Sequence, residues 1–361
     1  MAMNDCIRPV KAGIGAVVAL ALLIIGSPEA LAACGATTCF VVIGSQQQVP
    51  QKGLLTANLS YNYTPYHVQE GTNGIIPHAN QERKRLTLDN HQEIRSILQT
   101  YTLDLNYGLT ERFGLEVTVP YVRTRHRHLD ELGEANAGAG NPLLFTDNGI
   151  GDIRLTAKYN LLPTLRSMLV MGVGVSLPTG DYNARDQFGG LMEPTVQAGR
   201  GATGLIGSVY QTYEVIPHRL NQFSFASYRH TFRNSDGYQF GDEYLLNLGV
   251  NLVTVPWLVL TSQFNYRYLT HDSMDASLRQ SLPPVPPGGD PSTIDPNITN
   301  RAVPNTGSTY LAYTLGFLIN LGETTQFYSY AQIPIARDFN NNLVQGVSYV
   351  VGITRFFQVS K

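Results

Sequence analysis

The sequence predicts an all-β fold, a transmembrane antiparallel up-and-down β-barrel of about twelve strands. From residue 53 onward, apolar and polar side chains alternate through successive segments of about ten residues, and each segment ends in a turn. The connections also alternate, one short and the next long. Both alternations are typical of outer-membrane barrels, where lipid-facing and lumen-facing side chains alternate along each strand and short periplasmic turns alternate with long outer loops.

Each predicted strand has an apolar face and a polar face. In the segment 101–107, Tyr101, Leu103 and Leu105 share one face, whereas Asp104 lies on the other. The same division recurs in the segments 54–63, 113–121 and 153–161, with charged residues only on the polar face. Strands of soluble β-sandwiches also alternate, but they average about 5 to 6 residues, whereas about ten are needed to cross a bilayer. We therefore expect the apolar face to contact lipid and the polar face to line a lumen.

The connections place both termini on the periplasmic side. Short turns are expected at 108–112, 162–167, 217–222, 254–257 and 322–325, and long loops at 64–92, 124–150, 179–203, 233–242, 270–309 and 336–347. Tyrosine and phenylalanine gather at both ends of the strands, as in the two aromatic girdles of membrane barrels. Three segments, 203–215, 223–232 and 325–335, carry apolar or aromatic residues on both faces, so periodicity leaves their orientation open.

The amino terminus has the three parts of an export signal. Arg8 and Lys11 precede an apolar run over residues 12–25, and the small-residue stretch 30–32 follows. The chain is therefore divided into a signal peptide at 1–32, a periplasmic N-terminal segment at 33–52 and one outer-membrane barrel at 53–361.

The residues after the predicted cleavage site allow two interpretations. Cleavage after Ala32 leaves Cys34 and Cys39 as an even pair in an oxidising compartment, which favours a disulfide. The four residues ending at Cys34, Leu-Ala-Ala-Cys, also resemble the lipobox of bacterial lipoproteins, in which the cysteine is acylated. Acylation would leave Cys39 as a lone thiol, so we favour the disulfide.

A family resemblance, which covers about residues 100–181, rests on three motifs: YGLTERFGLEVTVPYV, GIGDIRLTAKYNLL and GVSLPTGDYN. Over this stretch the chain resembles a family of uncharacterised bacterial outer-membrane proteins named for a role in the meta-pathway of phenol degradation. The resemblance implies a β-barrel with a transport or channel role for small aromatic or hydrophobic compounds. It implies no catalytic residues.

The polar face supplies the candidate site residues of the lumen. They are Asp104, Glu116, Asp152, Arg154, Lys158, Glu243, Gln263, Asn265 and Arg267. We expect the charged residues to pair with one another, because an unpaired buried charge costs several kcal/mol; alternatively, they select a charged or polar solute. About twelve strands enclose a space between that of eight-stranded barrels filled by side chains and that of open porins, which predicts a narrow or partly plugged pore.

One histidine pattern raises the question of a metal site. His126, His128 and Asp130 occupy alternate positions, so on an extended strand they would project from one face near the outer rim. Imidazole and carboxylate groups can hold a divalent ion. Because Arg125 and Arg127 keep the local field positive, the sequence favours a solvated strand end or loop, and we predict no metal site.

Composition and motifs narrow the function further. The charged fraction is 14%, the formal net charge is -2, and no basic run is present, so nucleic-acid binding is not expected. No Gly-x-Ser-x-Gly elbow or cofactor motif occurs, and we predict neither an enzyme nor a bound cofactor. The expected role is passive passage of a small molecule through the outer membrane, with the bilayer, the solute and the barrel assembly machinery as partners. The alternatives are a structural or adhesive surface barrel and a barrel hydrolase.

Overall fold

The barrel wall is built from antiparallel strands joined in sequence order. The computed structural model describes residues 41–80, 87–129, 143–164, 166–185, 191–274, 303 and 305–359. In these residues the wall strands are β1 (Leu54–His67), β3 (Thr87–Gly108), β4 (Phe113–Leu129), β5 (Leu143–Ile150) followed by β6 (Arg154–Asn160), β7 (Ser167–Ser176), β8 (Gly204–Ile216), β9 (Leu220–Thr231), β11 (Glu243–Val255), β12 (Leu258–Leu269), β14 (Ser308–Asn320), β15 (Thr325–Asp338) and β17 (Ser348–Gln358). Short elements complete the described fold: β2 (Ile75–Asn80), β10 (Tyr238–Gln239), β13 (Ser273–Met274), β16 (Val344–Gln345), the helix α2 (Gly44–Gln47) and the 3-10 turn η2 (Pro194–Val196).

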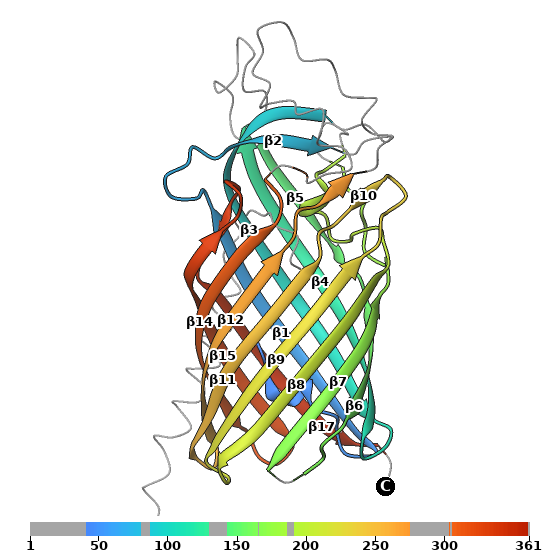
Figure 1. Ribbon diagram of the computed structural model, residues 1–361, viewed down its shortest axis with the longest axis vertical. Coiled ribbons are helices and arrows are strands. Elements are labelled where there is room, and N and C mark those ends of the chain that lie inside the picture. The colour runs from blue at the N-terminus through green and yellow to red at the C-terminus, as the bar shows by residue number, and fades with distance from the viewer. Residues whose placement is uncertain are drawn as a thin grey trace, which may run out of the picture. The chain divides into compact units, whose positions relative to one another are not determined.

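The sheet closes on itself through β1, which pairs with β3 on one side and with β17 on the other. The register with β17 runs from Leu54 opposite Gln358 to Tyr63 opposite Tyr349. β5 and β6 both pair with β4 and together fill one position in the wall, so the barrel has twelve strands, as predicted (Figure 1). Closure matters because a sheet edge facing lipid would leave backbone N–H and C=O groups without partners.

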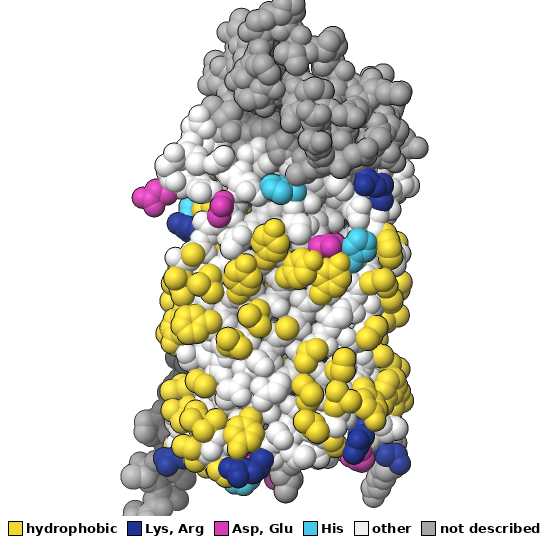
Figure 2. Space-filling model, in the orientation of Figure 1, with side chains coloured by type: hydrophobic (Ala, Val, Ile, Leu, Met, Phe, Trp, Pro, Cys, Tyr) yellow, Lys and Arg dark blue, Asp and Glu magenta, His cyan; other side chains and the backbone are white. Residues whose placement is uncertain are grey.

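The two faces of the wall have the polarity that the sequence predicts. Leu59, Leu103 and Val173 point outward and are 53%, 38% and 70% exposed, whereas Asn58 and Asp104 on the inner face are buried. Figure 2 shows hydrophobic side chains spread over the outer wall, with charged side chains mainly at its two ends. Such an apolar belt requires a lipid environment, and it excludes a soluble sandwich, in which these side chains would meet in a dry interior. Within the described residues, no helix is long and apolar enough to cross a membrane.

The short turns lie where the sequence places them, at 109–112, 161–166, 217–219, 256–257 and 321–324. Two of the predicted long loops are partly wrong. In the stretch 64–92, β1 continues to His67 and β3 already starts at Thr87, and in 124–150, β4 continues to Leu129 and β5 starts at Leu143.

These strands extend past the apolar belt, and their outward side chains there are polar. Arg95, Arg123 and Arg127 are all exposed on the outside of β3 and β4. The apolar alternation therefore stops at the membrane surface, although the backbone pairing continues beyond it. The predicted signal peptide, Cys34, Cys39, Asp130 and most of the loop 270–309 lie outside the described residues.

Polarity of the two faces can be tested at one pair of neighbours. Leu103→Arg should lower the free energy of unfolding by about 2 to 4 kcal/mol, because it places a charge among acyl chains. Asp104→Asn should cost less, since an amide can keep a hydrogen bond with the inner-face side chains Asn58 or Thr118. Urea titrations of the barrel folded into lipid vesicles measure both values. Equal losses at the two positions would contradict the assignment of faces.

Candidate functional site

The segment 41–52, which precedes β1, lies within the lumen near the end of the barrel that carries the short turns (Figure 1). Its backbone is held by polar side chains of the inner wall. The Val42 N–H donates to Gln263 Oε1 at 3.1 Å, and Gln263 Nε2 donates to the Val42 carbonyl at 3.3 Å. Asn106 Nδ2 donates to the Gln48 carbonyl at 2.8 Å. The described part of the expected periplasmic segment is therefore a plug inside the barrel.

The plug also buries apolar side chains against aromatic residues of the wall. The contacts form two clusters: Val42 and Val49 with Tyr210 and Phe223, and Val41 and Ile43 with Tyr328 and Tyr330. The aromatic residues come from β8, β9 and β15, the strands whose orientation the sequence leaves open. These strands are apolar on both faces because the outer face contacts lipid and the inner face contacts the plug.

Charged side chains of both signs surround the plug. Lys158 contacts Glu116 and also donates to the carbonyl of Gln46 in the plug. Arg229 Nη2 lies 3.1 Å from Glu243 Oε1. Opposite charges thus neutralise each other on the inner wall, as expected for charges removed from bulk water.

A hydrogen-bond network holds Asp104 in the same region. Its carboxylate accepts from Thr118 Oγ1 at 2.8 Å and from Asn58 Nδ2 at 3.2 Å. Asn58 Oδ1 in turn accepts from Tyr328 and from Thr354, each at 2.8 Å. Asp104 is therefore positioned by neutral donors from neighbouring strands.

Three further candidates, Gln263, Asn265 and Arg267, follow one another on the inner face of β12. Asn265 Nδ2 donates to Gln263 Oε1 at 2.9 Å, which orients the amide that binds the plug. Arg267 is 1% exposed, and its guanidinium carbon lies 5.4 Å from the ring centre of Tyr310 and 5.8 Å from that of Phe339. The aromatic faces thereby stabilise a cation in the interior.

Asp152 has a different environment from the other candidates. It lies at the break between β5 and β6, and its carboxylate accepts from the backbone N–H groups of Gly180 and Arg200, each at 3.1 Å. Both donors belong to the connection between β7 and β8. Asp152 therefore anchors this connection to the wall.

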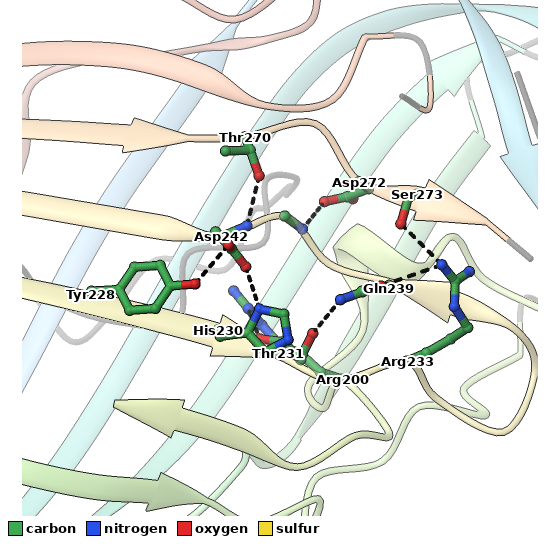
Figure 3. Close-up of polar contacts among 11 residues, drawn as sticks. Arg200, Tyr228, His230, Thr231, Arg233, Gln239, Asp242, Thr270, Asp272 and Ser273 are labelled. Atoms are coloured by element: carbon green, nitrogen blue, oxygen red, sulfur yellow. Dashed lines mark hydrogen bonds and ion pairs between the residues drawn. The ribbon is translucent and has the colours of Figure 1, made fainter. Parts of the chain in front are cut away.

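Polar contacts also tie the outer connections to one another (Figure 3). The Asp242 carboxylate lies 2.7 Å from His230 Nδ1, and the Asp242 N–H donates to Thr270 Oγ1 at 2.8 Å. The Gly241 N–H donates to Asp272 Oδ1 at 2.7 Å. These hydrogen bonds link the connection between β9 and β11 to the start of the connection that follows β12. Burial of Asp272 in this network raises the pKa of its carboxyl group.

A cavity of 130 Å³ lies between the plug and the wall. Its lining is chemically mixed. Charged groups come from Asp104, Glu116, Arg154, Lys158, Arg229 and Glu243, and apolar groups from Val41, Val42, Ile43, Ile206, Phe225 and Leu245. The cavity can hold a small molecule that has both an apolar body and a polar group.

His126 and His128 depart from the environment that the sequence favours. Both project to the inside of β4 and are buried, at 1% and 3% exposure, so they do not form a solvated strand end. The neighbouring arginines follow the alternation: Arg127 is exposed and Arg125 half-buried.

Comparison with solved structures shows the same fold. The chain is similar to the COG4313 outer membrane channel from Pseudomonas putida F1, with 15% identity and a TM-score of 0.54 over 88% of this chain and 100% of that chain. Weaker similarity extends to a FadL homologue of Pseudomonas aeruginosa, with 12% identity and a TM-score of 0.38 over 85% of this chain and 90% of that chain. The CymD monoaromatic hydrocarbon channel has 10% identity and a TM-score of 0.40 over 85% of this chain and 89% of that chain.

Family membership rests on the sequence itself. No curated protein matches the chain. The model of one family, described as "Putative MetA-pathway of phenol degradation", matches residues 87–283, which is more than half of the chain. The protein is thus an outer-membrane β-barrel that belongs to this family.

Proposed function

We propose that this protein is a passive channel for small aromatic or hydrophobic molecules, and that the plug formed by residues 41–52 sets the width of the passage. The observation that carries the proposal is the cavity of mixed lining between the plug and the wall of a closed barrel. The family description, which names phenol degradation, agrees with such a solute.

The size of the cavity favours a small solute. A cavity of about 150 Å³ in another protein accommodates benzene, and the cavity beside the plug measures 130 Å³. A monocyclic aromatic molecule would therefore pass after a small displacement of the plug. A larger solute would require the plug to leave much of the lumen.

The lining favours an uncharged solute with one polar group. Because Glu116 is matched by Lys158 and Glu243 by Arg229, the cavity presents no strong field of one sign. Phe225 and Val42 offer apolar surface in the same cavity. A hydroxyl group could exchange hydrogen bonds with the polar side while the ring stays on the apolar side.

A catalytic role is not supported by the buried histidine of the inner wall. Ser96 Oγ lies 3.3 Å and Glu93 Oε2 3.5 Å from the same atom, Nδ1 of His126. A serine hydrolase requires the serine and the carboxylate on opposite nitrogens of the ring. We therefore infer that this group does not activate a nucleophile and that the protein is not an enzyme.

Uptake of a labelled monocyclic phenol tests the proposal. Outer-membrane vesicles that retain lipopolysaccharide should take it up several-fold faster with the protein than without it. Val42→Trp should remove most of this gain, because the larger side chain fills the cavity. Leu155→Trp, on the lipid-facing side, is the matched control and should keep the gain. Uptake at the same rate with and without the protein would refute the channel.

Ion conductance in planar bilayers tests the plug separately. The double variant Asn106→Ala with Gln263→Ala removes four hydrogen bonds to the plug, each worth about 1 kcal/mol. If the bonds add, the open fraction should rise by about three orders of magnitude until it saturates. Thr261→Val, which removes an inner-wall bond to Asn251, should behave as wild type. Unchanged conductance of the double variant would mean that the plug does not limit passage.

A further inference from the structure

We infer that His126, His128 and Glu193 bind one divalent transition-metal ion, such as Zn²⁺, at the outer end of the barrel. One ligand atom from each side chain lies within 4.8 Å of the other two. The histidines come from β4, whereas Glu193 comes from the connection between β7 and β8. This inference does not depend on which solute the channel carries.

One nitrogen of each imidazole ring faces a nitrogen of the other ring. His126 Nε2 and His128 Nδ1 are 2.6 Å apart, and the ring planes are inclined at 74°. Two nitrogen ligands of a tetrahedral zinc ion are about 3.3 Å apart, given Zn–N bonds of about 2.0 to 2.1 Å. The two histidine nitrogens would therefore need to separate by less than about 1 Å to bind the ion together. The Glu193 carboxylate supplies the third ligand, and water can occupy the fourth position.

The surroundings of His126 match those of a metal ligand. Its other nitrogen, Nδ1, lies 3.5 Å from Glu93 Oε2 and 3.3 Å from Ser96 Oγ. Metal-binding histidines usually donate their second ring N–H to a carboxylate or similar acceptor, which fixes the ring and raises its basicity. Glu93 is 1% exposed and Ser96 is 0% exposed, so both are held in place by the interior.

The site is shielded on its apolar side. Phe145 of β5 packs against both rings, at 4.6 Å from the His128 centroid and 6.1 Å from that of His126. The same phenylalanine belongs to a buried cluster with Met192 and Val196, which flank Glu193 in the chain. An ion at this point would join the connection between β7 and β8 to the wall.

Charge and ligand type decide which ion fits. Glu193 and Glu93 together carry two negative charges, which balance those of a divalent cation, while Arg125 and Arg127 point to the other side of β4. Two imidazole ligands favour zinc, copper or nickel, whereas calcium and magnesium prefer oxygen ligands.

Equilibrium dialysis of the detergent-solubilised full-length protein against Zn²⁺ tests the site. We expect one ion per chain and no competition from a large excess of Ca²⁺. His128→Gln and Glu193→Gln should each weaken binding at least 10-fold, while His230→Gln, at a histidine paired with Asp242 elsewhere, should not. Heat-modifiable migration in gels verifies that each variant is folded.

Hydrogen exchange provides a second measurement, because an ion would link the loop to the wall. Zn²⁺ should slow exchange in residues 191–199 of the wild type but not of Glu193→Gln. The inference fails if the wild type binds no stoichiometric Zn²⁺, if both ligand variants retain wild-type affinity, or if exchange of this loop is the same with and without the ion.

Discussion

The requirement that every backbone polar group be satisfied in lipid dominates this structure. It forces β1 to pair with both β3 and β17, and the resulting closed wall leaves no edge within the apolar belt. Closure fixes which face of each strand meets lipid, because the side chains alternate with a strict period of two. It also encloses an interior that twelve strands cannot fill with their own side chains. The segment 41–52 occupies part of that space.

The sequence predicts the orientation of a strand correctly where one face of the strand contacts only lipid and the other contacts only a polar interior. Leu103 and Asp104 are assigned correctly because lipid selects one face and a polar interior selects the other. The same logic fails at Tyr210, Phe223 and Tyr328, which are aromatic yet point inward. Their partners lie more than 160 residues earlier in the chain, so no local pattern reveals the contact. The apolar run Val41-Val42-Ile43, which ends ten residues before the first strand, is the signal that could have revealed the plug.

The environment of His126 and His128 could be predicted only in part, for a related reason. The i, i+2 spacing correctly predicts that His126 and His128 share a face, since that depends on the local backbone alone. Their burial depends on Phe145 and on the connection that carries Glu193, and Glu93 reaches them only through the pairing of β3 with β4. Asp130, the acidic neighbour in sequence, lies outside the described residues. The chemical environment of the two histidines is thus set by side chains of a loop and of neighbouring strands, which are distant in the sequence.

The same constraint indicates which part of the protein would move during the proposed passage of a solute. Opening the wall between β1 and β17 would expose backbone groups of paired residues from Leu54 to Tyr63 to lipid, at several kcal/mol for each unsatisfied group. Displacing the plug breaks a few hydrogen bonds and two small apolar clusters, and water inside the lumen can replace the bonds. The plug is therefore the element with the lower cost of movement, and the wall serves as the rigid frame against which it shifts.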